Sequence, residues 1–294
     1  MGGGSWTTKA YSTYCSLSGK TYDTITNMVL TASTSDGLAS SSCQSFYKST
    51  ELDKALNPYN VMRECLDTEE HPNTIPVILA LDITGSMGQA AVEVSKHLNR
   101  IMTALYDKIT DVEFMVMGIG DVECDFAPIQ ISQFESDIRI AEQLDKIYFE
   151  FGGGGNAYES YTAAWYMGSR HTKLDCWKRN KKGIIITMGD ERLNPILSLT
   201  NTRGNSSLEK ITGDNLQSKI ETADLYKEAS KKFDIYHIDV EHGSRWDGGI
   251  DNSWKILGDN YKKANLNNIA DIITDIIISA VENNTLNNSE GISW

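Results

Sequence analysis

The chain has few of the residues that cross-link small domains or bind zinc in them. Its 294 residues include five cysteines, an odd number, and no two of them form a Cys-x-x-Cys pair. The sequence therefore favours neither a disulfide framework nor a cysteine-based zinc site. Scattered thiols are typical of a reducing, intracellular compartment. They are Cys15, Cys43, Cys65, Cys124 and Cys176.

Positive charge is also scarce. Lys and Arg together number 27 against 40 Asp and Glu, which gives a formal net charge of −13. Because no stripe of Lys and Arg is present that would neutralise phosphates, nucleic acid is not expected as a main partner. A basic or cationic partner fits this charge better.

Long uninterrupted apolar runs are missing as well. The most apolar late stretch, residues 269–281, is broken by Asp271, Thr274 and Asp275 and is too short to span a bilayer. The first residues show neither the charged and apolar regions of a secretory signal nor the myristoylation pattern, because Trp6 stands where Ser or Thr is required. We therefore expect a soluble, cytoplasmic protein with no membrane partner.

Apolar strands and amphipathic helices alternate along most of the chain. Amphipathic spacing predicts a helix over 91–107, and a short strand within 124–131 is expected to pair antiparallel at the sheet edge. This alternation predicts an α/β fold, a doubly wound, Rossmann-like and mostly parallel sheet with helices on both faces. Apolar runs predict buried strands at 77–81, 114–119, 183–188 and 233–240.

Composition divides the chain into three parts. Residues 1–76 lack sustained periodicity but carry many aromatics, which predicts an N-terminal arm packed on the main domain. Within this arm, Pro58 at a first helical position predicts a short helix over 58–67. Residues 77–283 form the main domain, and the Asn-rich residues 284–294 are expected to be a flexible tail.

The apolar run at 77–81 leads directly into Asp82, Thr84 and Ser86. These residues are expected at the carboxyl edge of the sheet, where open α/β sheets bind ligands. Their hard oxygen atoms suit Mg²⁺, Mn²⁺ or Ca²⁺. Helix capping by the two hydroxyls is an alternative, but it needs no aspartate at the end of a strand. Asp121 and Asp190 follow two other predicted strands, and such carboxylates would repel one another without a cation.

The run Asp-Ile-Thr-Gly-Ser-Met-Gly that begins at Asp82 resembles the metal-ion-dependent adhesion site (MIDAS) of von Willebrand factor A (vWA) domains. The first loop of that site reads Asp-x-Ser/Thr-x-Ser, and two further loops complete it. The resemblance implies that Asp82, Thr84 and Ser86 match the first loop and Asp190 the third. In the second loop, Gly-Gly-Gly-Asn-Ala-Tyr-Glu resembles a Gly-Gly-Gly-Asp-x-x-Glu form of the family, with Asn156 in place of Asp and one charge fewer.

The resemblance also implies a function. A cation, Mg²⁺ or else Mn²⁺ or Ca²⁺, would be held by Asp82, Thr84, Ser86, Asn156 and Asp190. An Asp or Glu carboxylate of a protein partner would complete its coordination, within a multi-protein assembly of bacterial or phage origin. An AAA+ ATPase is one such partner, on family analogy alone.

Two alternatives remain open at the level of sequence. The first is a Mg²⁺-dependent phosphotransfer enzyme with Asp82 as nucleophile. Phosphatases of the haloacid-dehalogenase type need a second Asp where this chain has Thr84, so the general acid is missing and we expect a protein that is not an enzyme. The second is a structural vWA-like component whose metal site is degenerate at Asn156. His237 is expected in the core, and no Ser or Cys pairs recognisably with His242.

Overall fold

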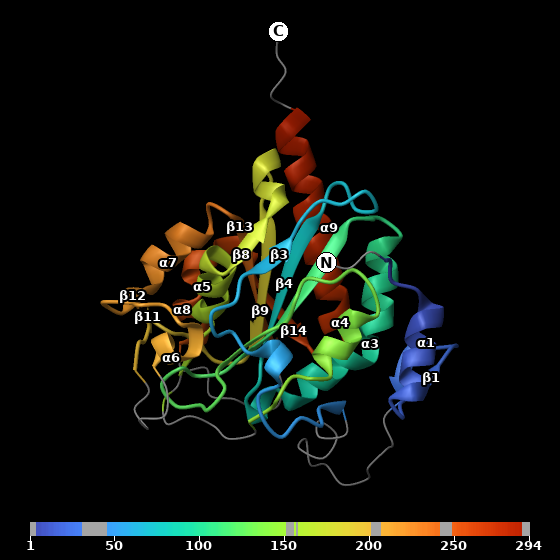
Figure 1. Cartoon of the computed structure of the whole chain (residues 1–294), viewed down its shortest axis with the longest axis horizontal. Helices are drawn as coiled ribbons and strands as arrows, with labels where there is room; N and C mark the ends of the chain where they lie inside the picture. The colour runs from blue at the N-terminus through green and yellow to red at the C-terminus, as the bar shows by residue number, and fades with distance from the viewer. Residues whose placement is uncertain are drawn as a thin grey trace.

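A six-stranded β-sheet forms the centre of the computed structural model (Figure 1). Its strand order is β14-β13-β9-β4-β5-β6, and every neighbouring pair is parallel except β5 and β6. The predicted doubly wound α/β class and its antiparallel edge strand are thereby confirmed. The strands are β4 (Ile75–Asp82), β5 (Val112–Ile119), β6 (Ile129–Ile131), β9 (Gly183–Gly189), β13 (Phe233–Glu241) and β14 (Tyr261–Asn265). The structure describes residues 4–30, 46–150, 156, 158–200, 207–241 and 249–289, with the backbone alone for 284–289.

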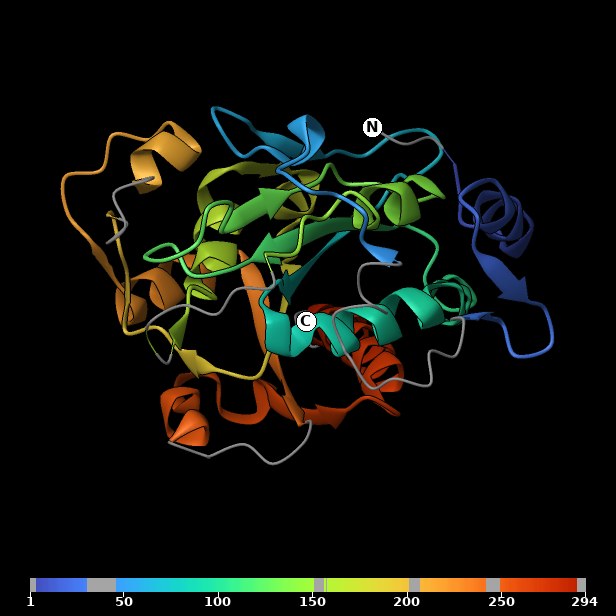
Figure 2. The ribbon, with the colours of Figure 1, turned by 90° about the horizontal axis from the view of Figure 1, so that it is seen from below.

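Helices cover both faces of this sheet. One pair packs on one face and a second pair on the other, as Figures 1 and 2 show from two directions. The first pair is α3 (Gly88–Tyr106) and α9 (Ile269–Ser289), and the second is α5 (Thr162–Arg170) and α7 (Thr222–Ala229).

The central strand β4 contributes to both cores. Val77, Leu79 and Leu81 join the core under α3 and α9, whereas Ile78 and Ala80 join the core under α5 and α7. Because successive side chains of a strand point to opposite faces, burial on both sides requires an unbroken apolar run. The same reasoning did not find β14, since its sequence Tyr-Lys-Lys-Ala-Asn is mostly exposed at the sheet edge and pairs with β13 through the backbone.

The register of the strands sets where their carboxyl ends meet. Asp82, the last residue of β4, pairs with Ile119 at the end of β5. On its other side β4 pairs with β9, with Leu81 opposite Met188. The loops that follow β4, β5 and β9 therefore leave the sheet side by side.

The N-terminal residues pack on helix α3. Helix α1 (Thr8–Leu17) and the hairpin of β1 (Thr21–Asp23) and β2 (Met28–Leu30) lie beside it, in blue at one side of Figure 2. Trp6 Nε1 donates a hydrogen bond to Asn99 Oδ1 (2.9 Å).

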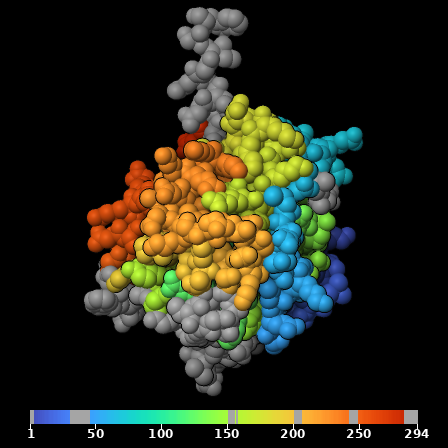
Figure 3. All heavy atoms as spheres, turned by 60° about the vertical axis from the view of Figure 1, so that its left-hand side comes forward, coloured from blue at the N-terminus to red at the C-terminus, as the bar shows by residue number. Residues whose placement is uncertain are grey.

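Residues 46–66 run along another side of the molecule, where Figure 3 shows them against the segment that contains α6. Strand β3 (Arg63–Cys65) pairs in parallel with β8 (Thr172–Leu174), and the Asn60 amide donates to Thr212 O (2.9 Å). The predicted helix over 58–67 is therefore wrong, because backbone groups of this stretch bond to distant segments.

The remaining elements are η1 (Lys54–Leu56), η2 (Gly85–Met87), α4 (Arg139–Leu144), β7 (Tyr158–Glu159), η3 (Asp175–Arg179), β10 (Arg192–Leu193), β11 (Ile196–Leu197), α6 (Leu208–Thr212), β12 (Ile220–Glu221), α8 (Ile250–Ser253) and η4 (Lys255–Asn260).

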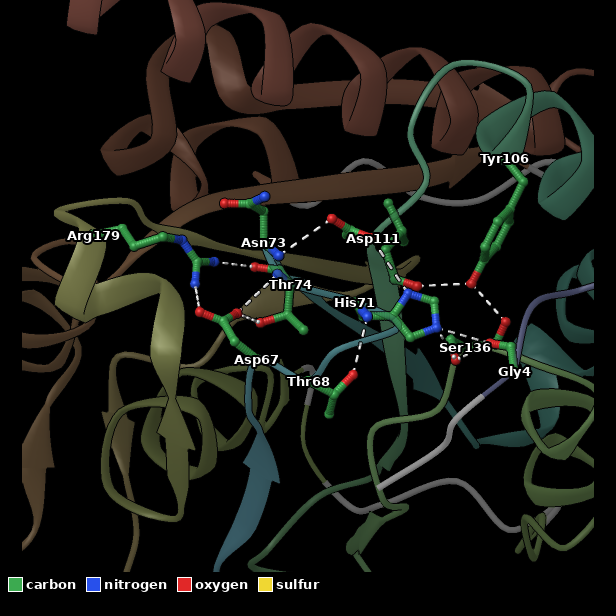
Figure 4. Close-up of polar contacts among 11 residues, drawn as sticks. Gly4, Asp67, Thr68, His71, Asn73, Thr74, Tyr106, Asp111, Ser136 and Arg179 are labelled. Atoms are coloured by element: carbon green, nitrogen blue, oxygen red, sulfur yellow. Dashed lines mark hydrogen bonds and ion pairs between the residues drawn. The ribbon is translucent and has the colours of Figure 1, made fainter.

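A buried histidine connects the arm to the amino edge of the sheet (Figure 4). His71 Nε2 lies 3.0 Å from Gly4 O, and Nδ1 lies 3.4 Å from Asp111 Oδ1, just before β5. Ser136 Oγ donates to the same Gly4 oxygen at 2.6 Å. The arm is thus attached at the end of the sheet opposite the loops that follow β4 and β9.

The described part of the chain bears on two expectations from composition, which concern disulfides and membrane-spanning helices. None of its cysteines forms a disulfide, and all four are buried; Cys43 lies outside it. Nor is any helix in these ranges long and apolar enough to cross a membrane. Residues 290–294 of the predicted tail also lie outside the described residues, and the backbone of α9 continues to Ser289.

Candidate metal centre

The first loop holds its polar side chains against the end of β4. Asp82 is 1% exposed, and its Oδ1 accepts hydrogen bonds from the Thr84 amide (2.9 Å) and from Thr84 Oγ1 (2.6 Å). Neither η2 nor α3 receives a side-chain cap at its N-terminus. The Thr84 hydroxyl is therefore committed to the aspartate, whereas capping would direct it to a helix amide.

A chain of hydroxyls connects the first loop to the third. Thr84 Oγ1 lies 3.4 Å from Ser86 Oγ, which donates to Asp190 Oδ1 at 3.1 Å. Asp190 follows β9 directly and is 7% exposed, whereas Ser86 is exposed to solvent. Four of the five residues that the sequence predicts as ligands thus form one hydrogen-bonded group, and solvent reaches it at Ser86.

Tyr161 forms the floor of this group. Its hydroxyl donates to Asp82 Oδ2 (2.9 Å) and accepts from the Glu191 amide (3.3 Å). A Cβ atom on Gly189 would lie 1.9 Å from that hydroxyl oxygen, so the glycine is what lets the tyrosine reach Asp82. Sequence reasoning missed Tyr161, because nothing in its local pattern distinguishes it from other core aromatics.

Beneath Tyr161 lies His237, which is completely buried. Its ring centroid is 5.0 Å from that of Tyr161 and 3.5 Å from that of Trp254, on which it stacks. His237 Nδ1 is 2.9 Å from Thr187 Oγ1. These contacts place His237 in the core that supports the centre, while His242 lies outside the described residues.

The fifth predicted ligand, Asn156, contacts a different aspartate. Its Nδ2 donates to Asp121 Oδ2 (2.7 Å), and its Oδ1 accepts from the Tyr158 amide (3.0 Å). Asp121 Oδ1 also accepts from Ser160 Oγ (3.3 Å). The structure thus groups Asn156 with Asp121, at the end of β5, and not with the hydroxyl chain between Asp82 and Asp190.

Glu159 adds a carboxyl group that the sequence analysis named only as part of the second loop. It is 5% exposed, and its Oε2 has no hydrogen-bond partner among the described residues. Burial, followed by the charges of Asp82, Asp125 and Asp121, raises its pKa to about 11. Glu159 is therefore protonated at neutral pH unless a cation is nearby.

Burial acts in the same direction on Asp82. Desolvation and then the charge of Asp190 raise its pKa to about 7, although hydrogen bonds from Thr84 and Tyr161 oppose the shift. A divalent cation would favour the ionised form of both carboxyls, because the ion supplies the opposite charge that the buried acids lack.

The donor set fits a hard divalent cation. It consists of the carboxylates of Asp82 and Asp190 and the hydroxyls of Thr84 and Ser86, and oxygen donors of these types suit Mg²⁺, Mn²⁺ and Ca²⁺. Across the residues that the structure describes, no three His, Cys, Asp or Glu side chains converge as a metal-binding group. A cation here would accordingly depend on the two hydroxyls as well as on the acids.

The fold and the centre together define a doubly wound α/β protein with carboxylates and hydroxyls at the carboxyl edge of its sheet. No protein-family model and no curated protein matches the sequence. Among solved structures, 74% of the chain aligns with the open conformation of the pilus adhesin SpaC from Lactobacillus rhamnosus GG, at 12% identity and a TM-score of 0.48. The aligned part covers 31% of that chain, so the protein spans about a third of the SpaC structure.

Two other solved structures are similar at the same level. The vWF domain of the type V pili tip protein Mfa5 from Porphyromonas gingivalis aligns with 69% of this chain and 95% of its own, at 13% identity and a TM-score of 0.42. Proximal thread matrix protein 1 from the mussel byssus, with a zinc-occupied MIDAS motif, aligns with 71% of this chain and 48% of its own, at 11% identity and a TM-score of 0.44. Similarities this distant assign no function, which has to be inferred from the residues of the centre.

Proposed function

We propose that this protein is a divalent-cation-dependent binding module. Asp82, Thr84, Ser86 and Asp190 would hold the cation, with Mg²⁺ as the first ion to test and Mn²⁺ and Ca²⁺ as alternatives. The observation that carries the proposal is the continuous hydrogen-bonded group that joins Asp82 to Asp190 through two hydroxyls and opens to solvent at Ser86.

The chemistry of the partner follows from the charge of the centre. Asp82 and Asp190 repel a carboxylate in the absence of a cation, and the chain as a whole carries −13. A bound cation would reverse this preference locally and attract an Asp or Glu side chain of a partner protein. The resemblance of the first loop to the vWA family points to the same ligand, and an AAA+ ATPase partner rests on that resemblance alone.

The geometry favours binding over phosphotransfer. A nucleophilic Asp82 would have to reach a phosphorus atom, but it is 1% exposed and both of its oxygens accept hydrogen bonds. We therefore expect no Mg²⁺-dependent hydrolysis of an aryl phosphate. Turnover that disappears in Asp82→Asn would reinstate the enzyme alternative.

Calorimetric titration of the full chain with Mg²⁺ tests the centre. We expect saturable heat from the native chain. In Ser86→Ala and Asp190→Asn, Mg²⁺ affinity should fall by roughly 10- to 100-fold or more, because loss of a residue that only supports a metal ligand already has an effect of that size. Asp107→Asn, at the exposed far end of α3, is the matched control. Equal Mg²⁺ affinity in all four proteins would contradict the proposal.

A pull-down with and without EDTA then tests cation-dependent partner binding. The proposal expects a partner that EDTA releases and that Ser86→Ala fails to retain. A partner retained equally with EDTA would favour the structural alternative, in which Asn156 marks a site without metal.

A further inference from the structure

A polar cleft lies beside the candidate metal centre, an acidic centre built around Asp82 and Asp190. The cleft and the centre share the short strands β7 and β10. β7 and β10 pair in parallel, with Tyr158 opposite Arg192 and Glu159 opposite Leu193. Glu159 and Leu193 are buried, whereas Tyr158 and Arg192 are half-buried and line a cleft of about 300 Å³. Glu159 is therefore buried beside the metal centre, while Tyr158 and Arg192, together with Leu193, line the cleft.

The other polar groups in the cleft wall are hydrogen-bonded within the protein. Asn194 Nδ2 donates to Ile196 O (2.7 Å), and Thr222 Oγ1 donates to Asn194 O (2.5 Å). Ser253 Oγ donates to Ile250 O (2.7 Å) and accepts from the Leu193 amide (3.0 Å). These groups shape the cleft and leave little hydrogen-bonding capacity for a ligand.

Arg192 differs from them. Its guanidinium group makes no hydrogen bond or ion pair with any part of the chain that the structure describes, whereas Arg63, Arg100, Arg139, Arg170 and Arg179 all do. A guanidinium presents a planar fork of donors that matches a carboxylate or a phosphate. Tyr158 on the adjacent strand adds an aromatic wall to the same cleft.

We propose that the cleft between β7, β10 and α8 binds a carboxylate through Arg192. A carboxylate is favoured over phosphate because Arg192 lies only two residues after Asp190, so a ligand with a single charge meets less repulsion than one with two. If the proposed function holds, this carboxylate is a second acidic side chain of the partner whose first carboxylate reaches the cation. The recognised partner segment is then acidic at two positions.

Titration in EDTA isolates the cleft from the cation. The probe is glutamate with an acetylated amino end and an amidated carboxyl end, and the readout is amide chemical shifts of the full-length protein. We expect saturable shifts at Leu193 and Asn194 that are absent with the matching glutamine compound. Arg192→Met should abolish them, and Arg192→Lys should weaken binding by roughly fivefold or more because the bidentate contact is lost.

Two controls keep the outcomes separate. Arg100→Met, on the α3 side of the molecule, should bind the probe normally. Arg192→Met should have the same melting temperature and the same Mg²⁺ affinity as the native chain. Undiminished probe binding by Arg192→Met, or tighter binding of inorganic phosphate, would overturn the assignment. Absence of Mg²⁺ binding together with intact probe binding would refute the proposed function and leave the carboxylate cleft standing.

Discussion

Replacing Tyr161 with phenylalanine removes one oxygen atom from the floor of the acidic centre and keeps the buried ring. The lost hydroxyl donates to Asp82 Oδ2 at 2.9 Å and accepts from the Glu191 amide at 3.3 Å. A hydrogen bond to a charged group contributes about 1.5–3 kcal/mol, and the longer bond from the amide adds less. We therefore expect the free energy of unfolding to fall by about 2 kcal/mol and the melting temperature by on the order of 5 °C.

Urea unfolding followed by tryptophan fluorescence measures this change, and the midpoint should fall while the slope m stays constant. Tyr161 also orients Asp82, so Mg²⁺ affinity should fall by roughly tenfold, as for other residues that support metal ligands. Tyr166→Phe is the matched control, because Tyr166 lies on α5, the helix that Tyr161 directly precedes, and donates to Asp214, away from the centre.

The outcome for the two tyrosines separates structure from function. Tyr166→Phe should leave Mg²⁺ affinity unchanged and destabilise the chain less, because its hydrogen bond to Asp214 is only partly buried, whereas that of Tyr161 to Asp82 is buried. Native stability and native Mg²⁺ affinity in Tyr161→Phe would refute the assigned role. So would an equal loss of Mg²⁺ affinity in both variants.

Three further predictions concern stability. Burial raises the pKa of Glu113 above its ordinary 4.5, so its protonated form stabilises the fold below that pH and this contribution is lost as pH rises through the folded pKa. Glu113→Gln should remove this loss. In urea unfolding, the free energy of unfolding of the variant relative to that of the native chain should therefore increase from acidic to neutral pH; a difference that does not change with pH would contradict the raised pKa. Gly189→Ala should cost roughly 1–3 kcal/mol or more in thermal unfolding, because its Cβ would lie 1.9 Å from the Tyr161 hydroxyl; native stability would show that Tyr161 moves freely. Trp6→Phe should cost about 1 kcal/mol by losing the bond to Asn99 and should speed limited proteolysis of the N-terminal arm; unchanged cleavage would mean that other contacts hold the arm.

Apolar patterning predicted the main strands because burial on both faces requires it. Val77 to Leu81 and Ile184 to Met188 are buried without exception, and both runs lead into acidic residues at the same sheet edge. Strands that are held mainly by backbone pairing, and not by burial of apolar side chains, were harder to predict from the sequence. β14 is mostly exposed and held by backbone pairing, and β3 has only three residues and depends on β8 for its partners.

Some contacts of the candidate site could be predicted from the sequence and others could not. Asp82, Thr84 and Ser86 are close in sequence, so a strand that ends at Asp82 brings them together with no further information. Ser86 and Asp190 are 104 residues apart, yet Asp190 was predicted, because parallel strands place their carboxyl ends at one edge. The pairing of Asn156 with Asp121 was not predicted, because the path of the second loop decides which aspartate its amide faces.

By itself, the sequence determined the α/β class, the strands of the central sheet other than β14, and the acidic edge, since each follows from local periodicity and from where strands end. Only the tertiary structure decided which side chains meet there. Tyr161 reaches Asp82 across 79 residues because Gly189 leaves space for its hydroxyl, and Arg192 faces a cleft because β10 pairs with β7. Such contacts depend on register and close packing between distant segments, and no local pattern of residues encodes either of them.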